Sequence, residues 1–349
     1  MATIHDVARV AGVSISTVSY ALSGKRSITA ATRARIDRAV AELGYRPNAG
    51  ARMLAGSRTS IIALTAPMHG DTHPPALMSF VLAVVTAARS YDYDVLLLTQ
   101  DDSLSGLRRV ASSSLVDGIV MMDVAVEDER VPVLRDLDLP SALIGIPHET
   151  AGLTCVDLDF EAAADLAVGR LVDLGHESVG MLGHSQHLYD RGSNFAPRFR
   201  DGYLAAGAAR GIRTAFHTTE STREAVTAAL DAVRAELPDL SALVLNCNEN
   251  VHSILLELLR ERGVRVPEDL SLVSACSSFP TDHLVPPLDV IPLPAADQGR
   301  RAVELLMERL DGRGEPHVEL IPPEYRPLGS TAAPAARDAP APAPATAAA

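Results

Sequence analysis

The spacing of apolar residues predicts a short helix at the start of the chain. Thr3 and Asp6 have the spacing of a capping box, which favours a helix beginning near Ile4. The apolar residues that follow recur at intervals of three and four, so they share one helix face. They are Ile4, Val7, Ala8 and Ala11. Gly12 and Val13 then interrupt the pattern, and a turn is expected there.

A second helix is predicted directly after that turn, with Ser14 as its N-terminal cap. The side chains expected on its inner face are Val18, Ala21 and Leu22. Those expected to face outward are Ile15, Ser16 and Tyr20. A helix, a Gly-containing turn and a second helix are typical of a helix-turn-helix motif.

A third helix completes an all-α head at residues 1–45. Thr29 can cap it, and Gly44 suits the left-handed residue that ends many helices. Its apolar face holds Ile36, Ala39, Val40 and Leu43. Its polar face holds Arg33, Arg35 and Arg38.

From residue 60 onward, short apolar runs alternate with amphipathic segments, which is the pattern of an α/β fold. The expected strands include 61–66, 95–99, 118–122, 142–146, 179–183, 242–245 and 270–275. The expected helices include 160–174, 223–236, 251–262 and 296–310. About 270 residues of this kind exceed one ordinary domain, so the sequence predicts two doubly wound lobes.

The head and the remaining chain carry opposite charge. Residues 1–58 contain nine Lys/Arg and three Asp/Glu, a balance of +6; because the whole chain carries −13, the remaining residues carry −19. A basic block on an acidic protein is typical of nucleic-acid binding. A solvated surface helix is the alternative interpretation of the same charges.

Residues 3–24, TIHDVARVAGVSISTVSYALSG, and 32–56, TRARIDRAVAELGYRPNAGARMLAG, resemble the LacI/GalR family of bacterial repressors. The resemblance spans residues 2–330, closely in the head and more loosely beyond it. It implies a sequence-specific DNA-binding transcriptional regulator, most simply a repressor, whose second helix enters the major groove of double-stranded DNA.

By position in that family, the base-reading side chains are Ile15, Ser16 and Tyr20. The phosphate-contacting side chains are Ser14, Thr17 and Ser19. Tyr20 stands where the family often has Arg or His, so the bidentate contact that Arg makes with guanine is lost and the preferred operator differs. For Ile15, packing in the core of the head is the alternative to contact with a thymine methyl.

Residues 46–58 are expected to form a hinge helix, capped by Asn48 and ended by Gly56. Two helical turns are marginal in isolation because nucleation is costly. The resemblance implies that two such helices, one from each subunit, pair in the minor groove through Asn48, Ala51 and Leu54. Leu54 would wedge into a base step and kink the duplex. Docking on its own core is the alternative for this side chain.

The resemblance also implies a core like that of periplasmic sugar-binding proteins, with two lobes joined by three crossovers. The first lobe is expected at residues 60–160 with 289–312, and the second at 161–288 with 313–330. The tail, 331–349, is rich in Ala and Pro, so disorder is expected there. Because the tail lacks apolar heptads, a homodimer on a pseudo-palindromic operator is the economical assembly.

Ligands of parallel sheets bind beyond the carboxyl ends of the strands, and a cleft between two lobes collects several such ends. The loops expected there are 68–75, 123, 147–148, 184–194, 246–250 and 276–278. The candidate effector-binding residues are Asp71, His73, Tyr189, Arg198, Asn248 and Glu249. These polar side chains suit a small hydroxylated effector, in the first place a carbohydrate or its derivative. For each of them, an ordinary surface-loop role is the alternative.

Several positions depart from the family pattern in this region. Phe199 occupies the position of the usual effector-binding Arg, which leaves the neighbouring Arg198 as the possible substitute. Cys276 and Ser277 stand where Asp is common, and Glu249 stands where the family usually has Asp. The chain has no Trp to stack on a sugar face. These departures put the ligand site in doubt.

Other chemistries find little support. The chain has no Gly-rich phosphate loop, no HExxH and no G-x-S-x-G elbow, so we expect no enzyme, no catalytic residue and no cofactor. His184 and His187 are three apart, but no Cys or His spacing completes a zinc site, so no metal is expected. Three widely spaced Cys, no signal peptide and no membrane-length apolar run favour the cytoplasm and exclude a membrane partner.

The sequence hypothesis is therefore a dimeric repressor whose cleft binds an effector that controls how the hinge segments pair. The alternative that the ligand is a corepressor, which strengthens operator binding instead of weakening it, stays open. A DNA-binding regulator without a functional ligand site is one alternative. A sugar-binding or sugar-modifying enzyme with a DNA-binding head is another.

Overall fold

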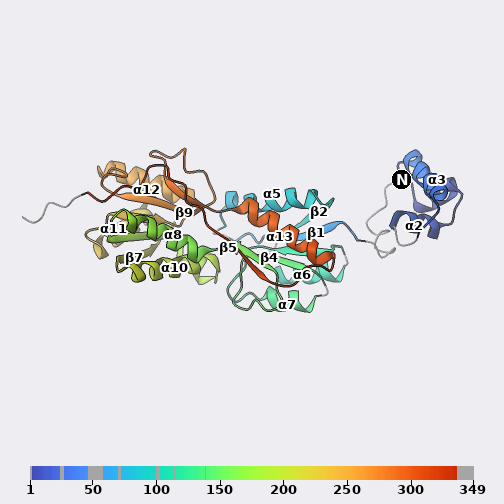
Figure 1. Ribbon diagram of the computed structural model, residues 1–349, viewed down its shortest axis with the longest axis horizontal. Coiled ribbons are helices and arrows are strands. Elements are labelled where there is room, and N and C mark those ends of the chain that lie inside the picture. The colour runs from blue at the N-terminus through green and yellow to red at the C-terminus, as the bar shows by residue number, and fades with distance from the viewer. Residues whose placement is uncertain are drawn as a thin grey trace, which may run out of the picture.

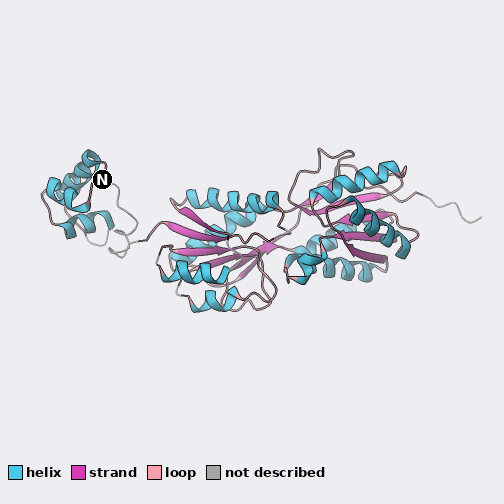
Figure 2. Ribbon diagram, turned by 180° about the vertical axis from the view of Figure 1, so that it is seen from behind, coloured by secondary structure: helices cyan, strands magenta, loops and turns pink. Residues whose placement is uncertain are grey.

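The computed structural model describes residues 2–23, 27–45, 58–69, 72–99, 103–113, 115–137 and 139–335. They form a helical head and two α/β lobes that lie end to end (Figure 1). Figure 2, seen from behind, shows strands in the middle of each lobe with helices on both sides. The expected fold class, an all-α helix-turn-helix head with a core of two doubly wound lobes, is confirmed.

The head consists of α1 (Ile4–Ala11), α2 (Ile15–Ser23) and α3 (Ala30–Leu43). The capping box at the start of α1 is present: the Thr3 amide donates to Asp6 Oδ2 at 3.0 Å, and the Asp6 amide donates to Thr3 Oγ1 at 3.4 Å. Thr29 caps α3 as expected, and Gly44 ends it with φ 58°. Local sequence signals therefore set these helix ends.

Three aliphatic side chains, one from each helix, are fully buried in the head: Val7, Val18 and Ile36. Leu22, which was expected on the inner face, is instead 38% exposed. The core of the head contains Val18 and Ala21 from α2 but does not extend to Leu22.

The first lobe is built on a six-stranded parallel sheet of order β11-β5-β4-β3-β1-β2. Its strands are β1 (Ile61–Thr65), β2 (Asp94–Leu98), β3 (Gly118–Met121), β4 (Ser141–Ile144), β5 (Cys155–Leu158) and β11 (Val318–Ile321). Helices α5 (Pro74–Arg89) and α13 (Ala295–Leu310) cover one face. Helices α6 (Ser103–Ser112) and α7 (Arg130–Asp136) cover the other. Ile62 and Leu64 face the first helix pair and Ala63 the second, as strand alternation requires.

The second lobe is built on a five-stranded parallel sheet of order β10-β9-β8-β6-β7. Its strands are β6 (Ser178–Gly183), β7 (Arg213–Thr218), β8 (Ala242–Leu245), β9 (Ser271–Ser277) and β10 (Asp289–Pro292). Helices α8 (Phe160–Asp173) and α10 (Phe195–Arg210) cover one face. Helices α11 (Arg223–Glu236) and α12 (Glu249–Glu261) cover the other, and the short α9 (Gln186–Asp190) follows β6.

The chain crosses between the lobes three times, but two of the expected boundaries are shifted. β10 was expected in the first lobe, yet it pairs with β9 of the second. β11 was expected in the second lobe, yet it pairs with β5 of the first. Both are edge strands that extend an existing ladder, and the ladder that an edge strand joins depends on distant residues rather than on its own pattern.

The described part of the tail, residues 331–335, differs from the expected disorder. The Thr331 hydroxyl donates to Asp289 Oδ2 at 2.6 Å, and the Ala332 amide donates to Ser271 Oγ at 3.0 Å. The Ala332 carbonyl oxygen lies 2.9 Å from Nε2 of the buried His176. These contacts attach the start of the tail to the second lobe. Residues 336–349 lie outside the described ranges.

Candidate functional site

The second helix of the head presents the side chains that the sequence predicts as DNA-reading. Ile15 is 42% exposed and Tyr20 is 37% exposed, and Ser16 is also exposed. These exposures exclude the alternative that Ile15 packs in the core of the head. A large apolar side chain in water is a cost unless a partner covers it.

A hydroxyl cluster occupies the N-terminus of the same helix. Ser14 Oγ accepts from the Thr17 amide at 3.1 Å and lies 2.9 Å from Ser16 Oγ and 2.8 Å from Thr17 Oγ1. Ser14 therefore caps α2, and the helix dipole places positive potential where a phosphate contact is expected. Ser19 lies further along α2, half-exposed. The predicted hinge residues Asn48, Ala51 and Leu54 lie outside the described residues.

A cavity of about 210 Å³ lies between the two lobes, at the carboxyl ends of β1, β3, β4, β6, β8 and β9. Several strand ends therefore meet there, as expected for open parallel sheets. Its polar lining includes Thr72, His73, Asp123, Asp157, His184, Ser185, Arg191, Asn194, Asn246, Asn248, Ser278 and Gln298. Its apolar lining includes Leu77, Phe80, Ile144, Phe160, Leu188, Phe195 and Leu293.

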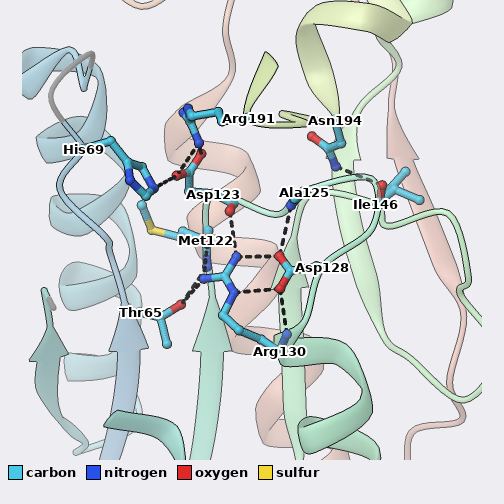
Figure 3. A network of polar contacts seen from close by, with 10 residues as sticks. All are labelled: Thr65, His69, Met122, Asp123, Ala125, Asp128, Arg130, Ile146, Arg191 and Asn194. Atoms are coloured by element: carbon cyan, nitrogen blue, oxygen red, sulfur yellow. Dashed lines mark hydrogen bonds and ion pairs between the residues drawn. The ribbon is translucent and has the colours of Figure 1, made fainter. Parts of the chain in front are cut away.

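One ion pair joins the lobes at the edge of this cavity. Arg191, after α9, donates to both carboxylate oxygens of Asp123, after β3, at 3.0–3.2 Å (Figure 3). His69 Nε2 lies 3.0 Å from Asp123 Oδ2. Asp123 therefore connects the loop after β1 with the opposite lobe.

Backbone contacts reinforce the same junction. Ala125 and Ser193 form an antiparallel bridge, and the Val126 amide donates to the Gly192 carbonyl at 2.8 Å. The Asn194 side chain donates to the Ile146 carbonyl at 2.9 Å. The lobes are thus linked by directional bonds close to the cavity.

A buried ion pair supports Asp123 from below. Asp123 has φ 52°, a left-handed conformation that costs free energy in a residue other than glycine. Arg130 donates to the Asp123 carbonyl at 2.6 Å and to the Met122 carbonyl at 3.1 Å, while its guanidinium pairs with Asp128 at 2.6 Å (Figure 3). Burial opposes ionisation of Asp128, but the bonds from Arg130 outweigh it and lower its pKa.

A second carboxyl group lies at the end of β5. Asp157 accepts from Arg198 Nη1 at 2.9 Å on one oxygen, and from the Leu158 amide at 3.0 Å and Gln298 Nε2 at 3.4 Å on the other. Burial raises the pKa of Asp157 to about 7, although Arg198 acts in the opposite direction. Arg198 also binds Glu161, with its Nη2 2.8 Å from the carboxylate.

Two buried polar atoms in the cavity wall have no hydrogen-bond partner. They are Nδ1 of His73 and Oδ1 of Asn246. Burial lowers the pKa of His73, which favours its neutral ring. Because native proteins rarely leave such atoms unsatisfied, both indicate groups that a bound molecule completes.

The structure brings some of the predicted effector-binding residues together and leaves others aside. His73 and Asn248 line the cavity, and Asp71 lies outside the described residues. Tyr189 instead packs edge-on against Phe216 with its ring centroid 5.7 Å away. Arg198 lies behind Asp157, and Glu249 pairs with His283 at 3.2 Å. Neither these two nor Tyr189 belongs to the cavity lining.

Sequence reasoning named Asp123 and the loops that hold Arg191, Asn194 and Asn246, but it did not place any of these four among the candidate effector-binding residues. Their local sequence gave one usable signal, since each follows a predicted strand or lies in the loop after one. Asp157 was missed because β5 was not among the expected strands, and Gln298 was missed because it lies in the predicted helix α13 rather than in a loop after a strand.

The departures from the family pattern have structural consequences. Phe199 is fully buried in the core between α10 and the second sheet, so this position cannot reach a ligand. Cys276 lines the cavity with φ 55°, and burial raises the pKa of its thiol, which favours the uncharged form. Ser277 is buried beside Ser274.

Metal binding and membrane insertion find no support in the described residues. Among them no group of three or more His, Cys, Asp and Glu side chains is placed to hold a metal ion. None of the helices in the described ranges combines the length and the apolar composition needed to cross a bilayer.

Two family models match the chain. The model of bacterial regulatory proteins, lacI family, matches residues 3–48, and a periplasmic binding protein-like domain matches residues 151–331. The HTH-type transcriptional regulator CelR of Thermobifida fusca is 28% identical over 91% of this chain and 95% of its own length. The HTH-type transcriptional repressor PurR of Photobacterium profundum is 29% identical over 93% of this chain and 97% of its own.

Solved structures share the fold. A lac repressor dimer bound to operator and the anti-inducer ONPF superposes with a TM-score of 0.76 at 21% identity, covering 95% of this chain and 99% of that one. A CelR–cellobiose complex has a TM-score of 0.64 at 24% identity, covering 95% and 100%. With its helix-turn-helix head, its two-lobed core and matches along nearly all its length, the chain belongs to the lacI family of bacterial regulatory proteins.

Proposed function

We propose that the protein is a homodimeric transcriptional repressor that reads a pseudo-palindromic operator with α2 and releases or retains it according to a small effector bound between the lobes. The observation that carries this proposal is the position of the cavity, since its walls come from both lobes and a ligand there must alter how the lobes meet. Catalysis and a cofactor have no part in the proposal, and action on operator DNA implies a cytoplasmic protein.

Exposure and chemistry on α2 support the DNA-reading role. Ile15 offers an apolar surface for a thymine methyl, and Ser16 and Tyr20 offer hydroxyls that can donate or accept at base edges. Ser14, Thr17 and Ser19 supply hydroxyls for phosphates, which fix register without reading sequence. Arg33, Arg35 and Arg38 on α3 are exposed and add positive potential to the head.

A carbohydrate effector is supported by the cavity and by the relatives. One solved structure that shares this fold is a complex of a transcriptional regulator CelR with cellobiose. In this chain, hydroxyl and amide side chains alternate with Phe160 and Phe195, whose rings lie 5.7 Å apart. A surface that combines hydrogen-bonding groups with aromatic rings suits a hydroxylated ring compound.

An apolar surface on the first lobe supports the homodimer. Its exposed apolar side chains are Met78 and Leu82 of α5, Tyr91, and Leu96 and Leu97, which lie on opposite faces of the edge strand β2. β2 is the edge of its sheet and packs beside α5 (Figure 1). Exposed apolar patches and open sheet edges are avoided in monomers, so a second copy of the chain is the simplest cover.

The coupling between cavity and DNA follows from linkage. If the effector favours one arrangement of the lobes and DNA the other, each must weaken the other's binding by the same factor. In this proposal the predicted hinge residues Asn48, Ala51 and Leu54 transmit the change, because paired hinge helices need the two first lobes held together.

The test is selection of binding sites from a random double-stranded pool, followed by titration of the selected site at several salt concentrations. We expect one palindromic consensus and an affinity that falls with salt. Tyr20→Ala should change the consensus while keeping the salt dependence, whereas Val10→Ala, an exposed apolar residue of α1, should leave the consensus unchanged. A pool that yields no preferred site contradicts the proposal.

A further inference from the structure

We infer that the cavity is built for an uncharged ligand that donates a hydrogen bond to Oδ1 of Asn246, and that it rejects phosphorylated and carboxylated compounds. This inference rests on the proposed effector function and specifies its ligand class. Four independent features of the described residues carry it.

The first feature is that cationic side chains at the cavity already bind carboxylates. Arg191 is the one guanidinium among the described lining residues, and it is engaged by both oxygens of Asp123. Arg198 approaches Asp157 from behind and also binds Glu161. An anionic ligand would have to displace one of these carboxyl groups, and the Asp123 carboxylate would face it.

The second feature is the state of three helix N-termini near the cavity, those of α5, α8 and α12, because helix N-termini in other proteins bind phosphate through free amides. α5 begins with Pro74 and Pro75, which have no N–H to donate. α8 is capped by Asp159, whose carboxylate accepts from the Ala162 amide at 2.9 Å. α12 has Glu249 in its first turn. At these three N-termini, the place where an anion could bind is therefore occupied by a proline or a carboxylate.

The third feature is the orientation of Asn246, which is only 1% exposed. Its Nδ2 donates to the Ala275 carbonyl at 3.2 Å. Rotating the amide would place oxygen against oxygen, so Oδ1 is held as the group without a partner. A buried acceptor in this position requires an O–H or N–H of the ligand, and a ligand without that donor leaves it unsatisfied.

The fourth feature is the size and polarity of the space. Its volume of about 210 Å³ is below the ~300–1,000 Å³ typical of pockets for drug-sized ligands. Leu77, Phe80, Phe160, Phe195 and Leu293 form much of its wall. A small ring with an apolar face fits this wall, whereas a phosphate group would lose its hydration against these apolar side chains.

The inference can be tested on the unmodified protein with matched pairs of compounds that differ by one phosphate: glucose and glucose phosphate, fructose and fructose phosphate, adenosine and adenosine monophosphate. Binding is measured by thermal shift and by calorimetry. We expect binders among the uncharged members only. Binding of a phosphate ester without its parent compound overturns this inference but leaves the effector function intact. No binding by any member of the pairs contradicts both.

Two variants test the named residues with the uncharged compound that binds best. Asn246→Leu removes the acceptor and should weaken that compound about ten-fold, the effect of one buried hydrogen bond. Tyr189→Phe removes another buried hydroxyl without a partner, outside the cavity lining, and should leave the affinity unchanged. Equal affinities in all three proteins would overturn the role of Asn246.

A gain-of-binding variant tests the charge argument. Asp123→Asn removes the carboxylate that engages Arg191, so phosphate esters should bind this variant more tightly than they bind the wild type. Unchanged or weaker binding of the phosphate esters would show that pairing of Arg191 is not what excludes them.

Discussion

Arg191 of the second lobe holds Asp123 of the first through three N–H···O contacts of 3.0–3.2 Å, at a point where the two lobes also exchange backbone hydrogen bonds. Both side chains are about one-fifth exposed. The pair is therefore partly shielded from solvent, where an ion pair contributes more than at an open surface. Both residues of this pair line the cavity, so the pair can bias how tightly the lobes close.

Arg191→Gln should weaken effector binding by about ten-fold, because the ligand would then have to close the lobes without the help of this pair. Calorimetry with the effector found in the compound screen measures this change. Arg200→Gln is the matched control, since Arg200 lies in the same lobe over the rings of Tyr189 and Phe216 and contacts no residue across the cleft in the described contacts. Equal affinities for the two variants would contradict the role of the link.

The buried pair beneath this link predicts a non-additive effect on stability. Arg130→Met leaves the Asp128 carboxylate buried without its partner and should reduce the free energy of unfolding by about 3–5 kcal/mol. The double variant that adds Asp128→Asn should lose less than Arg130→Met alone, because the uncompensated charge is gone. Urea denaturation measures both.

An exposed pair provides the contrast. Arg265 and Asp269 lie four residues apart at the surface, so Arg265→Met should leave the free energy of unfolding nearly unchanged. If the two pairs gave similar losses, the distinction between buried and surface pairs in this protein would be wrong.

Much of the fold could be predicted because it depends on local signals. Thr3, Thr29 and Gly44 set helix ends in the head through bonds within three or four residues, and the apolar runs of the sheets are continuous. β7 was not predicted, because it is an edge strand in which about half of the residues are polar and no continuous apolar run marks it. β10 and β11 were assigned to the wrong lobes because edge pairing is decided by contacts with strands far away in the sequence.

The candidate site was less predictable for the same reason. Asp123 and Arg191 form an ion pair although they are 68 positions apart in the sequence, and no local sequence pattern indicates that they are in contact. Asn248 was named from the sequence as a candidate effector-binding residue, whereas Asn246 was included only as part of its loop. They differ in the structure because the Ala275 carbonyl, 29 positions later, fixes the orientation of the Asn246 amide.

The apolar surface of the first lobe predicts an oligomeric state that one charge should abolish. Leu82 of α5 is 60% exposed, and Leu82→Glu would place like charges across a two-fold interface and desolvate both of them. We expect sedimentation velocity to show a monomer, with operator affinity reduced as well. Leu204→Glu alters an apolar residue of α10 that is 39% exposed in the other lobe, and this control should remain a dimer. A dimer that survives Leu82→Glu would place the interface elsewhere.

Asp157 predicts how stability depends on pH. Burial raises its pKa to about 7 from an ordinary value of 3.8, so the folded protein retains a proton that the unfolded chain releases between these pH values. The contribution of this group to the free energy of unfolding therefore falls as pH rises from about 4 to about 7. Burial lowers the pKa of His252 to about 4, so the contribution of this group to the free energy of unfolding rises with pH below about 6.5. This contribution is the same in the wild type and in a variant at position 157, so it cancels in the difference between them.

Asp157→Asn isolates this contribution, because it removes the titration and keeps the size of the side chain. The free energy of unfolding of the variant, relative to wild type, should rise between about pH 4 and about pH 7. Asp165→Asn is the matched control: Asp165 pairs with Arg210, which lowers its pKa, so the difference from wild type should stay level over the same range. A level difference for Asp157→Asn as well would mean that this carboxyl is ionised throughout and that Arg198, rather than burial, dominates its environment.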